Sequence, residues 1–187
     1  MKKLIGSLVL KLMGWKLIVE EDLSQIPSCV MVCGPHTSNW DFVVTVAAFW
    51  KIQIPMKLFI KDSWTKPWYG FIIKWMGGIG VDRSQGQNLV RYAGKLLKDD
   101  SQRLYLVNTP EGTRSYVEKW KKGFYFIAKE GKVPIIFAAA DYKHKQAVIK
   151  GVIDPNQHSL EEVLKFAEEV YKDIHPKHPE NFNRDIQ

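Results

Sequence analysis

The chain has 187 residues, of which 45% are hydrophobic and 25% are charged. This balance is typical of one folded domain and excludes a disordered chain, a collagen-like repeat and a low-complexity protein. Against 20 acidic residues the chain has 27 lysines and arginines, a net charge of +7, which favours partners that carry phosphates or anionic surfaces. Two cysteines, Cys29 and Cys33, are too few for a disulfide framework or a zinc finger, which favours a reducing cytosol.

The first 18 residues form the first predicted element. On a helical projection their apolar side chains share one face, and Lys3, Ser7 and Lys11 lie on the other. No apolar run reaches the roughly 18 residues of a spanning helix, and Lys11 interrupts the stretch that could be a secretory signal. We predict an amphipathic helix over residues 1–18, which lies either in a membrane interface or against the protein's own core.

Short apolar runs then alternate with helical stretches. Strands are predicted over 29–33, 57–60, 79–81, 103–107, 133–139 and 147–149, and helices over 41–50, 66–76, 87–98, 122–129 and 160–171. No linker or repeat divides the chain. The prediction is a single α/β domain over 1–187, with a mostly parallel or mixed central sheet flanked by helices, an N-terminal amphipathic helix and an irregular tail over 175–187.

The first candidate site lies between strand 29–33 and helix 41–50, at a strand end where α/β sheets collect ligands. His36 and Asp41 can meet only if His36 lies in the loop and Asp41 in the first helical turn, because five positions of a continuous helix separate them by about 140°. Such a carboxylate orients an imidazole that takes a proton from a hydroxyl. Alternatively, Ser38 and Asp41 form a capping box and His36 is only a loop residue.

Two later strand ends carry arginines, Arg83 and Arg114. Each guanidinium offers a planar fork for a phosphate, and together they could share one anion. Gly112 lets the backbone approach a ligand closely, while Glu111 could either anchor the loop or bind a hydroxyl. The alternative is that both arginines are solvated charges or ordinary ion-pair partners.

Taken in order, these segments resemble a known family. His-x4-Asp, Gly-x-x-Val-x-Arg, Pro-Glu-Gly-Thr-Arg-Ser and Val-Pro-Ile-Ile are similar to the motifs of the glycerolipid acyltransferases, particularly 1-acylglycerol-3-phosphate acyltransferases, over residues 31–137. The resemblance implies that His36 is the catalytic base and Asp41 its orienting partner, in a catalytic core over 29–150. It also implies that the second and third motifs bind the phosphorylated acceptor through Gly78, Arg83, Glu111, Gly112 and Arg114.

The fourth motif, residues 133–136, implies acyl-donor contact or a structural role. The chain departs from the family pattern at Pro35, Gly80, Thr109 and Phe137. These departures leave the catalytic pair intact and put the identity of the acceptor in question.

The reaction implied by the resemblance moves a fatty acyl group from acyl-CoA or an acyl carrier protein to the hydroxyl of a lysophospholipid, with lysophosphatidate converted to phosphatidate. It requires no metal and no bound cofactor. One alternative is acylation of another lysolipid, such as an amino-acid-derived lipid. Another is a non-enzymatic basic module that binds lipid or nucleic acid, although lysine and arginine form no dense stripe, so nucleic acid is not an expected partner. We expect a cytoplasmic protein that is peripheral on the anionic inner face of the cell membrane.

Three further features have competing interpretations. Cys33 could carry an acyl group on its thiolate, but its place in a buried strand favours an inert thiol. The aromatic residues over 64–75 fit core packing, a membrane interface or the wall of an acyl-chain groove. The other histidines show no metal-ligand spacing with carboxylates, so surface positions are predicted for His144, His158, His175 and His178.

Overall fold

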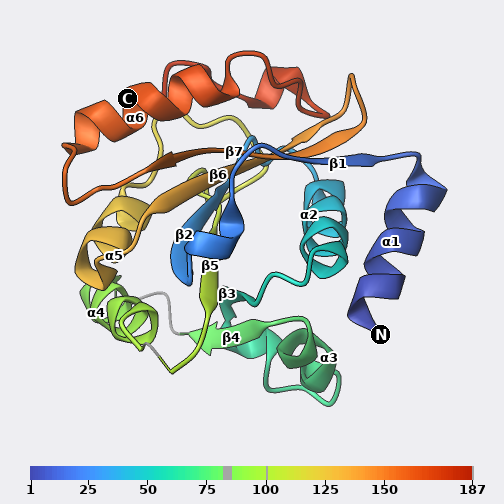
Figure 1. Ribbon diagram of the computed structural model, residues 1–187, viewed down its shortest axis with the longest axis horizontal. Coiled ribbons are helices and arrows are strands. Elements are labelled where there is room, and N and C mark those ends of the chain that lie inside the picture. Colours follow the sequence, from blue (N-terminus) through green and yellow to red (C-terminus); the bar gives the residue numbers. More distant parts are fainter. Residues whose placement is uncertain (82–85, 100, 187) are drawn as a thin grey trace.

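Seven strands form one sheet in the order β1-β7-β6-β2-β5-β3-β4 in the computed structural model, which describes residues 1–81, 86–99 and 101–186 (Figure 1). The strand bounds are β1 Lys16–Val19, β2 Ser28–Cys33, β3 Met56–Lys61, β4 Gly78–Val81, β5 Leu104–Asn108, β6 Ile135–Asp141 and β7 Gln146–Ile153. Strands β2 to β6 run parallel, β7 pairs antiparallel with β6, and β1 pairs parallel with β7. The predicted α/β class with a mixed sheet is therefore confirmed.

Helices cover both faces of the sheet (Figure 1). Their bounds are α1 Lys2–Met13, α2 Asn39–Lys51, α3 Gly70–Trp75, α4 Gly86–Leu97, α5 Gly123–Gly131 and α6 Leu160–Tyr171. Helices α1 and α2 share one apolar core with the sheet, and α4, α5 and α6 share the other. Because both faces are covered, the central strands are continuous apolar runs, and all six residues of β2 are buried.

The N-terminal helix is shorter than the predicted span of 1–18. It ends at Met13, where Gly14 adopts a left-handed conformation (φ 71°) and its amide caps the last turn. The following residues, Lys16–Val19, form the edge strand β1 instead, because they pair in register with Gln146–Ile149 of β7.

Helix α1 has one buried stripe and one exposed stripe. Gly6 lies against the backbone of α2, where an added Cβ would fall 2.3 Å from the carbonyl oxygen of Ala47, and Leu10 is buried. Leu4, Leu8 and Leu12 are exposed by 76%, 57% and 78%. One stripe therefore packs on the core and another faces outward.

The helix predicted over 66–76 is also shorter, because only Gly70–Trp75 is α-helical and Asp62–Trp64 forms a 3₁₀ turn. Its apolar side chains do not form a core stripe. They form an exposed surface that we call the aromatic ridge, made of Trp64, Trp68, Phe71, Ile72 and Trp75. Core packing is therefore the wrong interpretation for this segment.

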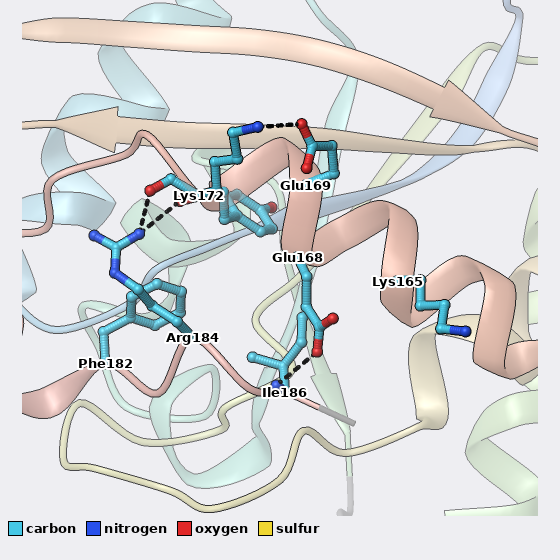
Figure 2. Close-up of a pocket in the computed structure, with 8 residues that line it drawn as sticks. Lys165, Glu168, Glu169, Lys172, Phe182, Arg184 and Ile186 are labelled. Atoms are coloured by element: carbon cyan, nitrogen blue, oxygen red, sulfur yellow. Dashed lines mark hydrogen bonds and ion pairs between the residues drawn. The ribbon is translucent and has the colours of Figure 1, made fainter.

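The tail beyond α6 contains one short 3₁₀ turn, Pro179–Asn181. It is fixed to α6 by polar contacts: the Arg184 guanidinium donates to the carbonyl of Lys172, and the Ile186 amide donates to Oε1 of Glu168 over 3.1 Å (Figure 2). These side chains line a shallow depression that shares no residue with the predicted catalytic pair. Among the helices in the described part of the chain, none has the length and hydropathy needed to cross a membrane.

Candidate active site

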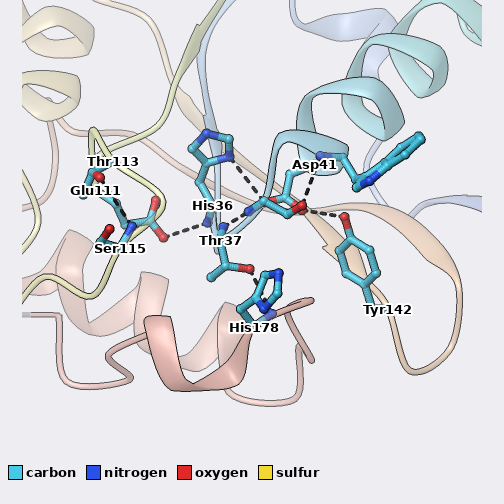
Figure 3. A network of polar contacts seen from close by, with 10 residues as sticks. His36, Thr37, Asp41, Glu111, Thr113, Ser115, Tyr142 and His178 are labelled. Carbon is cyan, nitrogen blue, oxygen red and sulfur yellow. Dashed lines mark hydrogen bonds and ion pairs between the residues drawn. The ribbon is translucent and has the colours of Figure 1, made fainter.

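Three neighbouring strands, β6, β2 and β5, end in loops that meet at one edge of the sheet. His36 follows β2, Glu111 follows β5, and Tyr142 follows β6. Because parallel strands point their carboxyl ends the same way, residues far apart in the sequence converge here (Figure 3).

His36 and Asp41 meet as the sequence requires. His36 lies in the loop before α2 and Asp41 in its first turn, with 3.3 Å between Nδ1 of His36 and Oδ2 of Asp41. The His36 side chain is 19% exposed and that of Asp41 is 7% exposed. The imidazole is thus held by a buried carboxylate while part of its ring is accessible.

The capping box predicted as an alternative is also present. Oδ2 of Asp41 accepts hydrogen bonds of 2.8 Å from the amides of Thr37 and Ser38, and the Ser38 hydroxyl accepts from the amide of Trp40 over 3.2 Å. The two interpretations do not compete, because one carboxylate caps α2 and faces His36. The backbone amides of the helix start fix its orientation.

Tyr142 supplies a contact that the sequence did not indicate. Its hydroxyl donates a 2.6 Å hydrogen bond to Oδ1 of Asp41, and its ring packs edge-on against Trp15 with centroids 5.0 Å apart. Burial and, next, the hydrogen bond to Asp41 raise the pKa of Tyr142 above its ordinary value, so the phenol stays a donor. Its position three residues after the predicted strand 133–139 was the one available signal.

Glu111 is a buried carboxyl group, 5% exposed, that joins two loops. Its Oε1 accepts a 2.9 Å hydrogen bond from the amide of His36, and Oε2 has no hydrogen-bond partner among the described residues. Burial raises the pKa of Glu111 to about 7. Of the two predicted roles, the structure shows the loop anchor.

Of the remaining predicted binding residues, the described ones lie in two places, the loop after β5 and strand β4. Gly112 has a left-handed backbone (φ 69°) directly after Glu111, and Arg114 is exposed in the same loop. Gly78 is buried in β4, where an added Cβ would fall 2.7 Å from Cγ2 of Ile73. Strand β4 is the third strand from β2, about 14 Å away at the usual strand spacing, and Arg83 lies outside the described residues.

Cys33 does not have the features of a nucleophile. The side chain is buried at the end of β2, and burial raises the pKa of its thiol well above the ordinary range. Because the thiolate is the reactive form, the inert thiol expected from the sequence fits this geometry.

Two of the other histidines are closer to a carboxylate than their spacing suggested. Nδ1 of His144 lies 2.7 Å from Oδ2 of Asp141, and Nδ1 of His175 lies 3.8 Å from Oδ1 of the same residue. Sequence spacing could not indicate this cluster, because the packing of α6 brings His175 to the end of β6.

A histidine oriented by a carboxylate at the carboxyl edge of an α/β sheet defines an enzyme site suited to removing a proton from a substrate. Residues 16–139 match the acyltransferase family, and this range includes His36, Asp41, Glu111 and Arg114. The chain therefore belongs to the acyltransferase family, which confirms the family expected from the four motifs, and it is an acyltransferase enzyme.

The fold is similar to that of a solved structure, the 1-acyl-sn-glycerophosphate (LPA) acyltransferase PlsC from Thermotoga maritima. The TM-score is 0.62 and the sequence identity 20%, over 94% of this chain and 80% of that one. A comparison with curated proteins found no match.

Proposed function

We propose that this enzyme transfers a fatty acyl group from an acyl thioester to the hydroxyl of a lysophospholipid, with lysophosphatidate as the preferred acceptor. The observation that carries the proposal is the pairing of His36 with Asp41 inside the matched family region. The description of the structurally similar Thermotoga protein as an LPA acyltransferase supports the acceptor class.

In the proposed reaction His36 is the general base. Since Nδ1 faces Asp41, the carboxylate favours the tautomer with its proton on Nδ1, which leaves Nε2 to take the proton of the acceptor hydroxyl. The hydroxyl oxygen forms a C–O bond with the thioester carbonyl carbon, the C–S bond breaks, and the departing thiolate recovers the proton from Nε2. A positioned general base contributes about 10²- to 10⁴-fold to such a step.

The loop that carries Glu111 contacts the His36 loop and also carries Arg114, a candidate ligand for the acceptor phosphate. The hydrogen bond from the His36 amide to Glu111 couples the two loops, and Arg114 is exposed three residues further on. We assign the phosphate of the acceptor to the Arg114 guanidinium, together with the motif residue Arg83. This contact supplies proximity and orientation. Proton transfer through His36 and departure of the thiolate need neither a metal nor a bound cofactor.

The acceptor can be tested with the purified full chain, given acyl-CoA or an acylated carrier protein and a panel of lysolipids. Phosphatidate is the expected product, and Arg114→Ala should raise the KM for lysophosphatidate at least about tenfold by removing a charged hydrogen-bond donor. Arg91→Ala, an exposed arginine on α4, is the matched control and should behave as wild type. Turnover confined to acceptors without a phosphate would assign the enzyme to amino-acid-derived lipids. Salt-sensitive lipid binding with no transfer to any acceptor would instead identify a binding module.

We also propose that the exposed stripe of α1 and the aromatic ridge contact an anionic membrane together. Lys2 links the two surfaces, because its Nζ donates to the carbonyl of Trp75 over 2.6 Å and lies 4.9 Å from the centre of that indole ring. Exposed aromatic and leucine side chains with nearby lysines suit the interface of a bilayer.

Sedimentation with phosphatidylglycerol vesicles tests this surface. Trp68→Ala, which removes the indole exposed by 85%, should weaken binding several-fold. Phe126→Ala removes an exposed ring from α5 and serves as the control. Equal binding by both variants would contradict the assignment of this face.

A further inference from the structure

Three side chains that play no part in the proposed acyl transfer converge beside the β6–β7 turn. Asp141 ends β6, His144 lies in the turn, and His175 follows α6. One oxygen or nitrogen atom from each lies within 4.8 Å of the others. The group therefore gathers one carboxylate and two imidazoles from segments that are distant in sequence.

The distances suit a small divalent cation. Zinc bonds of about 2.0–2.1 Å in tetrahedral geometry place ligand atoms about 3.3 Å apart. Nδ1 of His144 lies 2.7 Å from Oδ2 of Asp141, a hydrogen bond that an ion would replace, and Nδ1 of His175 lies 3.8 Å from Oδ1 of the same carboxylate. The two imidazoles thus approach different oxygens of one carboxylate, and the 4.8 Å limit on the ligand atoms leaves room for one ion among them.

The surroundings of the cluster fix the Asp141 carboxylate and leave a nitrogen of His175 without a partner among the described residues. Asp141 is 4% exposed, and its Oδ1 accepts hydrogen bonds from the amides of Lys143 and His144 over 3.1 and 3.3 Å, which hold the carboxylate in place. Nδ1 of His175 is buried and has no hydrogen-bond partner among the described residues. A buried nitrogen without a partner is costly unless a ligand satisfies it, while the half-exposed His144 leaves a way in.

We propose that Asp141, His144 and His175 bind one zinc ion, with a water in the fourth position. Two imidazoles and one carboxylate suit zinc, whereas magnesium and calcium require six or more oxygen ligands. The ion would tie the segment after α6 to the β6–β7 turn. The two segments already share a 2.9 Å hydrogen bond from the Tyr142 amide to the His175 carbonyl. The site is thus a structural brace and is independent of the proposed acceptor chemistry.

The test uses the full chain after treatment with a chelator. Titration with Zn²⁺ against a chromophoric indicator should show one strong site per chain, and saturation should raise the Tm by at least about 4 °C. His144→Ala and His175→Ala should each weaken binding at least about tenfold and abolish the Tm shift. Mg²⁺ should not compete.

Two control variants locate the site. His158→Ala removes a histidine whose Nδ1 contacts only the Asp154 carbonyl among the described residues, and His36→Ala removes the proposed base. Both should bind zinc like wild type. Absence of a strong site in the wild type, or binding that survives both His144→Ala and His175→Ala, would overturn the proposal. Loss of binding in His36→Ala alone would move the ion to the active site.

Discussion

In the described part of the chain, two aspartates face histidines near the ends of the adjacent strands β2 and β6, and they differ in what surrounds the carboxylate. Asp41 accepts from two backbone amides and from the Tyr142 hydroxyl while it faces a single imidazole at 3.3 Å. Asp141 accepts from two amides of its own turn and faces two imidazoles, the nearer at 2.7 Å.

The pair proposed to be catalytic is therefore the one with the longer distance. Asp41 is held by a helix start and a phenol, so it can orient one ring toward a substrate, and its segment lies within the matched family range. Asp141 also lies near that sheet edge, but its histidines turn toward each other, with ring centroids 5.5 Å apart. Orientation of one ring favours base catalysis, while convergence of two rings favours metal binding.

The largest effect is expected from removing the imidazole of His36, the proposed base. His36→Ala should lower kcat by about 10²- to 10⁴-fold, because no group remains to accept the hydroxyl proton. Acyl transfer is measured beside circular dichroism, which should match wild type. Turnover within about tenfold of wild type in the folded variant would remove His36 from the base role.

A smaller effect should follow from the phenol behind the carboxylate. Tyr142→Phe keeps the ring against Trp15 but removes the hydrogen bond to Asp41, which should lower kcat about tenfold and leave KM unchanged. Tyr116→Phe, on an exposed tyrosine, is the control. A change in KM alone would show that Tyr142 acts on substrate binding instead of positioning Asp41.

Glu111 should make unfolding stability depend on pH. The pKa of Glu111 is about 7 in the folded state, against an ordinary value of 4.5, so the folded state binds this proton more tightly than the unfolded state does. The contribution of Glu111 to the free energy of unfolding therefore falls by about 3 kcal/mol as the pH rises through that interval. Glu111→Gln can keep an acceptor for the His36 amide, but its side chain does not titrate, so its stability does not fall with pH for this reason. The difference in free energy of unfolding, variant minus wild type, should therefore rise by about 3 kcal/mol between about pH 4 and pH 8. Parallel curves in urea unfolding would contradict the raised pKa.

The smallest effect on acyl transfer is expected from changing His144, which faces Asp141. His144→Ala should leave acyl transfer of the metal-free enzyme within about twofold of wild type, because His144 faces Asp141 and is half exposed. A loss comparable to that of His36→Ala in the same assay would show that both pairs take part in the reaction.

Local sequence was enough to predict that His36 and Asp41 meet, because they lie five positions apart across one strand end and one helix start. It was not enough for Tyr142, which lies 101 residues from Asp41. Nor could it show His175, which reaches Asp141 only through the packing of α6. The edge strand β1 escaped prediction because four residues carry little periodicity of their own and depend on pairing with β7.

A double-mutant cycle on His36 and Asp41, measured as kcat for acyl transfer to lysophosphatidate, shows directly whether the two residues act as one unit. If the two residues act as one unit, Asp41→Asn in the His36→Ala background should cost no more than about twofold, although it is strongly damaging alone. Losses that multiply in the double variant would contradict the proposed orientation of His36 by Asp41, because each residue would then contribute without the other.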